Sequence, residues 1–378
     1  MKLLVKTLFG LEDILADELR ELGAENIKPI KRAVACEGNL ALMYSANYNL
    51  RTALRVLTPV HQFQARSEQE LYDQVRAFDW SDILNTHQTF AIDNSVFSDV
   101  FRHSKFATLR MKDAIADQFR DKYDRRPSVD PKAPDVQFDL HGWKDRFTIS
   151  LDSSGESLNQ RGYRGKGHEA PLNEVLAAGM LQLAGWDKSK PLIDPMCGTG
   201  TLLIEAAMMG CNIPPQILRR NFGFRNWQDF NPTIWNRVKL DSDAKIRKAP
   251  LEIAGGDRDA RAVGMAKGSI RKLELREQVK VREIEFEVHK PLWESGMVIT
   301  NPPYGERIGE GDMAVFYKTI SDLLKQNYQN YEAWVLSSNI KALRSIRLAP
   351  SKKINLFNGA LECKFQQYKL YAGSRKEV

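Results

Sequence analysis

The feature that most constrains this 378-residue chain is an alternation of short apolar runs with helical patterns, which begins near Asn173. The apolar runs have the length of buried strands, and the segments between them have the spacing of amphipathic helices. This order is typical of an open, largely parallel sheet. The expected strands are PLID (191–194), LEIAG (251–255), VKVREIEF (279–286), MVIT (297–300) and AWVLS (333–337). We therefore predict an α/β domain over residues 173–378, ending in a hairpin that turns at Asn358-Gly359.

The residues before this domain predict two smaller α+β units and a linker. Residues 10–23 have a helical stripe of leucine and isoleucine that Gly23 closes, and strand-like segments at 2–9, 34–39 and 55–63 accompany it. The first unit is expected to cover residues 1–65, with a second helix near Asn39–Leu54. The second unit, 66–155, has a helical pattern at 107–123 and strand patterns at 136–143 and 145–152. Residues 156–172 are left as a linker.

The first strand of the α/β domain leads into a glycine loop. In LIDPMCGTGTLLIEAAMMG, Asp194 ends a strand, Gly198 and Gly200 form a tight turn, and Thr201–Met209 opens a helix. Such a junction directs unsatisfied N–H groups at an anion or a polar ligand. A P-loop would need Gly-x4-Gly-Lys-Ser/Thr, and a dinucleotide fingerprint would need a third glycine where Leu203 stands. Neither a P-loop nor a dinucleotide-binding loop is therefore favoured. The structural alternative is a helix start that needs glycine only for packing.

A second motif, Asn301-Pro302-Pro303-Tyr304, follows the strand at 297–300. The two prolines have no N–H group to donate, so the chain must leave the sheet there. In doubly wound sheets a ligand binds where the strand order reverses. If the strands at 191–194 and 297–300 are neighbours at that point, the glycine loop and this motif face one crevice. Asp257, which ends the next strand, is then placed to take both hydroxyls of a ribose.

The chemistry of this second motif suits a planar amino group. The side-chain oxygen of Asn301 and a carbonyl freed by the prolines are two nearby acceptors, and Tyr304 offers a ring on which a base can stack. Two acceptors pulling on the hydrogens of an exocyclic amine favour the tetrahedral nitrogen that attack requires. No general base with a special pKa is needed, because the alkylated product loses its proton readily. A proline turn with a core tyrosine is the structural alternative.

Charge is distributed unevenly along the chain. The net charge is +7, and the whole excess lies in residues 169–378. Phe101–Arg126 nevertheless has eight basic and four acidic residues, and more basic residues follow in the linker. Such patches suit phosphate contacts, although a solvated helix face would look the same. The candidate RNA-binding residues are Arg102, Lys105, Arg110, Lys112, Arg161 and Arg164. For Arg161 and Arg164, packing of the linker is the alternative.

An insertion at 212–250 combines eight basic and three acidic residues with Phe222, Phe224, Trp227, Phe230 and Trp235. Basic residues interleaved with aromatic ones suit unpaired or flipped nucleotides. A small satellite core beneath a basic surface fits the same composition equally well.

Several classes of protein are excluded by composition. No apolar run reaches the ~20 residues that a membrane span needs, and the N-terminal apolar run contains lysines and lacks a cleavage site. The four cysteines are scattered without a C-x-x-C pair, so neither a disulfide framework nor a metal site is expected. These features predict a reduced cytoplasmic protein. The sequence leaves the oligomeric state open.

The two motifs together resemble those of a known enzyme class. DPMCGTGT and NPPYGERIG are similar to class I S-adenosylmethionine-dependent methyltransferases that act on exocyclic amino groups. SLNQRGYRGKGHEAPLNEVLAAGML and the N-terminal layout resemble one branch, the THUMP-domain RNA methyltransferases similar to the bacterial 23S rRNA guanine-N2-methyltransferase. The resemblance covers nearly the whole chain, and RGYR…APLNE is its most particular segment.

The resemblance implies a ferredoxin-like segment at 1–65, a THUMP RNA-binding domain at 66–155, and a Rossmann-like domain with a mostly parallel seven-stranded sheet. It implies that Asn301, Pro302, Pro303 and Tyr304 hold the target base. An acid after the third strand usually contacts the cofactor adenine, and this chain offers Glu285 or Glu287 there without a clean alignment. The implied S-adenosylmethionine-binding residues are Asp194, Pro195, Cys197, Gly198, Gly200, Thr201, Asp257, Glu285 and Asn301.

We therefore predict methylation of an exocyclic amine in RNA, with guanine N2 of 23S rRNA favoured. Guanine N2 or adenine N6 in tRNA is the nearest rival. A protein glutamine methyltransferase would use the same Asn-Pro-Pro-Tyr motif but would not need an RNA module. A non-catalytic RNA-binding factor would not need the glycine loop or Asn301.

Overall fold

The computed structural model describes residues 1–98, 101, 104–165, 172–303 and 310–371. The chain divides into two compact units, each made of separate stretches. The first unit comprises Met1–Thr7, Ala16–Leu158 and Arg219–Leu240; the second comprises Leu8–Leu15, Asn159–Leu218 and Asp241–Val378. The predicted segments were continuous in sequence. The compact units differ from the predicted segments in two places. Residues 8–15 belong to the second unit, and residues 219–240 belong to the first.

The first unit contains an eight-stranded sheet with the order β2-β3-β1-β4-β8-β7-β5-β6. Its long strand β4 (Arg55–Gln64) pairs antiparallel with β1 on one side and with β8 on the other. The strands that the sequence divided between residues 1–65 and 66–155 therefore form one continuous sheet. The other strands are β1 (Lys2–Lys6), β2 (Glu25–Ile30), β3 (Ala33–Glu37), β5 (Thr89–Phe97), β6 (Ser128–Val129), β7 (Val136–Trp143) and β8 (Arg146–Asp152).

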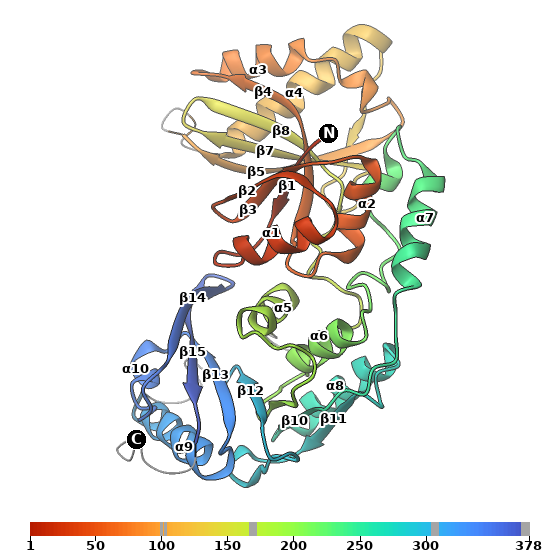
Figure 1. The fold of residues 1–378 in the computed structure, drawn as a ribbon. Helices are drawn as coiled ribbons and strands as arrows, with labels where there is room; N and C mark the ends of the chain where they lie inside the picture. The colour runs from red at the N-terminus through yellow and green to blue at the C-terminus, as the bar shows by residue number, and fades with distance from the viewer. Residues whose placement is uncertain (99–100, 102–103, 166–171, 304–309, 372–378) are drawn as a thin grey trace. The chain divides into compact units, whose positions relative to one another are not determined.

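The helices of the first unit begin at polar residues that cap them. Asn39 Oδ1 accepts from the N–H of Leu42 at 2.9 Å at the start of α2 (Leu40–Asn49), and Ser67 caps α3 (Glu68–Ala77) in the same way. α3 and α4 (Ser104–Tyr123) contact each other and lie on the same face of the sheet (Figure 1). α1 (Glu12–Glu21) and the short η1 (Trp80–Asp82) complete the helices before residue 159. Among the described helices, none is long and apolar enough to cross a membrane.

The insertion after the glycine-loop helix contributes to the core of the first unit. It forms η2 (Gly223–Asn226) and α7 (Pro232–Asp243). The ring of Phe224 lies 4.5 Å from that of Tyr44, and the ring of Trp235 lies 5.6 Å from that of Tyr48. The buried aromatic residues of the insertion are Phe222, Phe224, Trp227 and Trp235. The insertion thus forms a satellite core, and these buried rings do not offer a surface to unpaired nucleotides.

The second unit contains the predicted open sheet, in the order β11-β10-β9-β12-β13-β15-β14. Its first five strands in this order pair in parallel, and β15 runs antiparallel to β13 and β14. The C-terminal hairpin turns at Gly359, which has a φ of 62°, as the Asn-Gly pair predicted. The strands are β9 (Leu192–Asp194), β10 (Ile253–Asp257), β11 (Val279–Glu283), β12 (Gly296–Thr300), β13 (Tyr331–Ser337), β14 (Lys352–Asn358) and β15 (Leu361–Lys369).

Helices cover both faces of this sheet. α5 (Glu174–Leu183), α6 (Thr201–Gly210) and α8 (Ala260–Lys272) lie on one face, and α9 (Glu310–Asn327) and α10 (Ile340–Leu343) lie on the other (Figure 1). A buried cluster that includes Ile193, Val298 and Tyr317 joins β9 and β12 to α9. β9 pairs with β10 on one side and with β12 on the other, so the strand order reverses between β9 and β12. The predicted neighbourhood of these two strands is confirmed.

Candidate active site

The glycine loop connects the carboxyl end of β9 to α6. Gly198 and Gly200 have φ angles of 53° and 75°, which residues with a Cβ atom rarely adopt. A Cβ atom on Gly200 would lie 3.0 Å from the Cβ of Ala266, whereas one on Gly198 would meet nothing within 4 Å. Gly200 therefore permits close packing against α8, and Gly198 borders open space. No side chain of the described residues caps the start of α6, so its first N–H groups remain available to a ligand.

Asp194 links the two strands at which the order reverses. Its Oδ1 accepts from the Thr300 hydroxyl at 2.7 Å and from the N–H of Met196 at 3.2 Å. Because the carboxyl is buried, its pKa rises from 3.8 to about 7, although both hydrogen bonds act in the opposite direction. Asp194 thus holds the end of β9 to the end of β12, immediately before the second motif.

Asp257 holds the glycine loop from the neighbouring strand. Its Oδ2 accepts from the N–H of Gly198 at 2.7 Å, and its Oδ1 accepts from the N–H of Asp259 at 3.0 Å. The N–H of Cys197 also donates to the carbonyl of Gly256, at 2.9 Å. Each carboxylate oxygen can accept a second hydrogen bond. Asp257 can therefore hold the loop and still accept from both hydroxyls of a ribose.

Asn301 has a buried acceptor without a partner among the described residues. It follows β12 directly, and its side-chain Oδ1 is buried and accepts no hydrogen bond from residues 1–98, 101, 104–165, 172–303 or 310–371. Such an oxygen costs roughly 1–3 kcal/mol when it is left unsatisfied, so its position indicates a donor that arrives with a ligand. Pro302 is buried and Pro303 is exposed. Tyr304, the predicted stacking ring, lies outside the described residues.

The acid expected near the cofactor adenine lies just beyond β11. Glu285 is exposed at the start of η3 (Phe286–Val288), whose Phe286 is buried. The preceding residue, Ile284, donates its N–H to the carbonyl of Asp257 at 2.9 Å. This bond brings the segment that follows β11 beside the end of β10. The assignment of Glu285 to the adenine stays a prediction.

Behind the glycine loop, the linker contributes to a buried ionic cluster that sequence reasoning missed. Arg161 and Glu205 are both fully buried, with Nε and Oε1 3.5 Å apart, and Tyr163 donates its hydroxyl to the same Oε1 at 3.1 Å. Arg164 forms an ion pair with Glu174 at 3.1 Å and donates to the Thr201 hydroxyl at 2.8 Å. Glu205 stands in an otherwise apolar helix, and this was the available sequence signal.

This cluster favours the alternative for Arg161 and Arg164, in which they pack the linker and do not contact RNA. Arg161 has no exposed surface on its side chain, so its guanidinium cannot reach a phosphate. Arg164 is about three-quarters buried, and its two partners hold it against the first residue of α6. We interpret both arginines as residues that position the linker and the glycine-loop helix.

The predicted basic patch of the RNA module lies on α4, and much of it is engaged in contacts within the protein. Lys112 pairs with Asp113 at 3.0 Å, and the guanidinium of Arg110 lies over the ring of Tyr72 at 4.8 Å. Lys105 is exposed. Arg102 lies outside the described residues. The direct RNA contacts of Lys105, Arg110 and Lys112 stay predictions.

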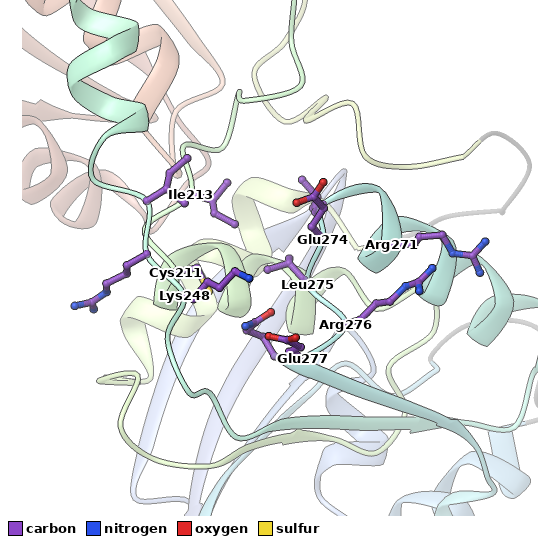
Figure 2. A pocket seen from close by; sticks show the side chains of 12 residues that line it. Cys211, Ile213, Lys248, Arg271, Glu274, Leu275, Arg276 and Glu277 are labelled. Atoms are coloured by element: carbon purple, nitrogen blue, oxygen red, sulfur yellow. The ribbon is translucent and has the colours of Figure 1, made fainter.

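A separate pocket in the second unit has a volume of about 530 Å³ (Figure 2). Its lining residues include Lys248, Arg271 and Leu275, which precede β10 and β11 or end α8. They therefore lie at the edge of the sheet opposite the glycine loop. Asp194, Asp257 and Asn301 are not among the lining residues. The pocket is not part of the candidate active site.

Three sequence families match consecutive parts of the chain. A family described as an RMKL-like methyltransferase domain matches residues 161–367. The THUMP domain matches residues 65–152, and a domain described as the RlmL ferredoxin-like domain matches residues 2–57.

Individual proteins resemble the whole chain. A Synechocystis sp. protein provisionally named an RNA methyltransferase is 38% identical over 96% of this chain and 95% of its own length. The ribosomal RNA large subunit methyltransferase K/L of Syntrophotalea carbinolica is 36% identical over 95% of this chain but 52% of its own length, so this chain spans about half of that relative. A crystal structure provisionally described as a methyltransferase, complexed with SAH, is 28% identical, covers 99% of both chains and has a TM-score of 0.88.

Proposed function

The chain belongs to the RMKL-like methyltransferases with a THUMP domain, and from this premise we propose that it methylates guanine N2 in large-subunit (23S) ribosomal RNA. The enzyme uses S-adenosylmethionine, whose product S-adenosylhomocysteine occupies a similar solved structure. The observation that carries the proposed chemistry is the buried, unpartnered Oδ1 of Asn301 at the carboxyl edge of the sheet. We also propose that the protein acts in the cytoplasm, where ribosomal RNA is made in bacteria.

The residues at the carboxyl edge of the sheet fit this cofactor. Gly198 borders open space, and no side chain in the described part of the chain caps the start of α6. The carboxylate of Asp257 has spare acceptor capacity for two ribose hydroxyls. When bound, the cofactor supplies an electrophilic methyl group on a sulfonium. We propose that Asp194, Pro195, Cys197, Gly200 and Thr201 shape the rest of its site, with Glu285 near the adenine.

Asn301 is proposed to bind the amino group that is methylated. Its Oδ1 accepts one N–H of the amine, and the carbonyl of Pro302 is the candidate second acceptor. The two acceptors draw the nitrogen from its planar form toward the tetrahedral form, which makes its lone pair available for attack. This interaction strengthens as the transition state forms, so it lowers the barrier to methyl transfer more than it raises substrate affinity. Tyr304 is proposed to stack on the target base.

No residue needs to remove a proton before the attack. The amine loses its proton readily once the nitrogen carries the new methyl group, and water can accept it. The Oδ1 of Asp194 is already engaged by the Thr300 hydroxyl and the N–H of Met196, so we assign Asp194 a positioning role.

The choice of ribosomal RNA rests on the relatives. Two curated relatives, at 36% identity over most of this chain, are named ribosomal RNA large subunit methyltransferase K/L. The chain matches about half of each, and we propose that the activity resides in the half that they share. The THUMP domain supports RNA over a protein glutamine as the substrate.

The test is nucleoside mass spectrometry of RNA from a strain in which the gene is deleted. We expect N2-methylguanosine to decrease in 23S rRNA and to return when the wild-type gene is restored, but not when Asn301→Ala is restored. Loss of N6-methyladenosine instead would overturn the choice of base, and loss in tRNA alone would overturn the choice of RNA. Unchanged modification in every RNA fraction would refute the proposed function.

A further inference from the structure

At the ends of four strands, one face of the THUMP sheet is not covered by any helix of the described residues. α3 and α4 cover the other face, where Phe63 and Phe147 are buried. Residues opposite each other in register share a face, so two rows cross β5, β7, β8 and β4 on the uncovered side. The outer row is Phe97, Trp143, Arg146 and Gln64, and the inner row is Ser95, His141, Thr148 and Gln62. All eight residues are exposed or half-buried.

The outer row presents two large rings to solvent. Phe97 is 61% exposed and Trp143 is 58% exposed. They are directly opposite each other on β5 and β7, with ring centroids 6.3 Å apart and ring planes inclined at 55°. Aromatic rings side by side on an open sheet face are the arrangement on which RNA-recognition sheets stack bases. Packing in the protein core does not explain two large apolar rings that are this exposed, and such exposed apolar groups often mark a binding surface.

The backbone fixes the position of this pair. The N–H of Lys144 donates to the carbonyl of Phe97 at 2.9 Å, which ties the β7–β8 turn to the end of β5. Lys144 itself has a φ of 56°, a conformation that costs free energy in any residue but glycine. The backbone that carries the two rings is therefore held in place before a ligand arrives, which reduces the entropy lost on binding.

The charge of this face suits a polyanion. The two rows contain Arg146 but no carboxylate, and Lys144 is exposed in the adjoining turn. The next row inward contains Asp93 and Asp139, which pair with Arg55 at 3.5 Å and with Lys6 at 2.5 Å, and Asp145 in the turn pairs with Arg66 at 3.5 Å. On the opposite side of the sheet, basic residues of α4 are balanced by acids. Lys122 pairs with Asp79 at 2.7 Å, and Arg120 pairs with Asp117 at 2.9 Å. Because the carboxylates near the two rows are paired, Arg146 and Lys144 are suited to contact an RNA backbone.

We propose that Phe97 and Trp143 form a stacking platform for unpaired nucleotides of the RNA substrate. This inference rests on the proposed function and specifies which surface of the THUMP domain receives RNA. Each ring stacks one base, Arg146 and Lys144 contact the phosphates, and His141 and the two glutamines contact base edges or sugars. A protein partner would require a larger apolar centre around the rings, whereas the neighbours here are polar.

The test compares leucine and aromatic substitutions in the full chain. Trp143→Leu and Phe97→Leu keep an apolar side chain but remove the π face, whereas Trp143→Phe keeps it. We expect each leucine variant to bind a fluorescent oligouridine roughly tenfold more weakly, Trp143→Phe to stay within about threefold of wild type, and affinity for a blunt RNA duplex to change little. Ile30→Ala, an exposed apolar site on the distant edge strand β2, is the matched control and should bind like the wild type.

Three outcomes would overturn the platform: unchanged oligouridine affinity in both leucine variants, equal losses for single-stranded and duplex RNA, or a loss in Trp143→Phe as large as in Trp143→Leu. Circular dichroism confirms that each variant is folded. Calorimetry with S-adenosylhomocysteine and methylation of 23S rRNA are measured on the wild type in parallel. A wild type that binds oligouridine through these rings but methylates no ribosomal RNA would refute the proposed function and leave the platform standing.

Discussion

Replacing Asp194 with asparagine should change how the stability of the second unit depends on pH. The pKa of the buried carboxyl is about 7 in the folded protein and 3.8 in the unfolded chain. As the pH rises, the unfolded chain therefore loses its proton first. The stability associated with the protonated carboxyl is fully present below pH 3.8 and is lost as the pH rises through 7. Asparagine resembles the protonated acid and carries no charge at any pH.

The structure gives the size of this effect. The two pKa values differ by roughly three units, which corresponds to ~4 kcal/mol in total. About two thirds of it, ~2.5 kcal/mol, develops between pH 5 and pH 8. An asparagine side-chain oxygen can still accept from the Thr300 hydroxyl, which donates to Asp194 at 2.7 Å. Relative to the wild type, Asp194→Asn should therefore gain ~2.5 kcal/mol when the pH is raised from 5 to 8.

The assay is urea unfolding followed by tryptophan fluorescence and circular dichroism at both pH values. Asp187→Asn is the control, because the Ser189 hydroxyl and N–H lower the pKa of the exposed Asp187 below its ordinary 3.8. That carboxyl is ionised in both states above pH 5, so the control should differ from the wild type by the same amount at both pH values. If Asp194→Asn behaves like this control, burial does not raise the pKa of Asp194 and the reasoning fails.

Three further predictions concern the site and its surroundings. Asn301→Ala should lower the single-turnover methylation rate at least ~100-fold while leaving S-adenosylhomocysteine affinity within about twofold by calorimetry; a loss confined to RNA affinity would contradict its role. Asp257→Ala should weaken S-adenosylhomocysteine binding by at least ~10-fold, because the variant loses both the ribose contacts and the hydrogen bond to the glycine loop. An unchanged affinity in calorimetry would contradict the role of Asp257 in cofactor binding. Arg161→Met should destabilise the protein by ~3 kcal/mol because Glu205 is left buried without its cation. Thermal unfolding measures this loss, and Arg161→Met/Glu205→Leu should recover most of it. A normal melting temperature with weaker oligouridine binding would restore the RNA role of Arg161.

Much of the second unit could be predicted because its strands have short, clearly bounded apolar runs. The run before Asn301 ends at two prolines, and β12 ends at Thr300. The hairpin after residue 351 turns at Gly359 in the left-handed conformation that glycine adopts readily. The loop geometry at Gly198 and the neighbouring positions of β9 and β12 also follow from local pattern and topology. Each of these features depends on residues that are close in sequence or on a general rule of parallel sheets.

The roles of the insertion and of Arg161 could not be predicted in the same way. Aromatic residues among basic ones give the same composition whether their rings face nucleotides or pack against Tyr44. The segment that packs there is distant in sequence: the N–H of Asn231 donates to the hydroxyl of Tyr44, 187 residues away. Nor does the composition of the linker show that Arg161 points inward. The useful signal was Glu205, because a carboxylate within a buried apolar helix requires a buried partner.

The discontinuity of the first unit has a consequence for synthesis on the ribosome. Its core is completed only by residues 219–240, which emerge after the glycine loop and α6 have been made. Asn231, which donates to the Tyr44 hydroxyl, is synthesised 187 residues after Tyr44. This corresponds to an interval on the order of 10–40 s at ordinary rates of translation. During that interval the aromatic side chains of α2 lack their final cover. The nascent chain therefore presents an apolar surface to chaperones for longer than a protein whose domains are completed one after the other.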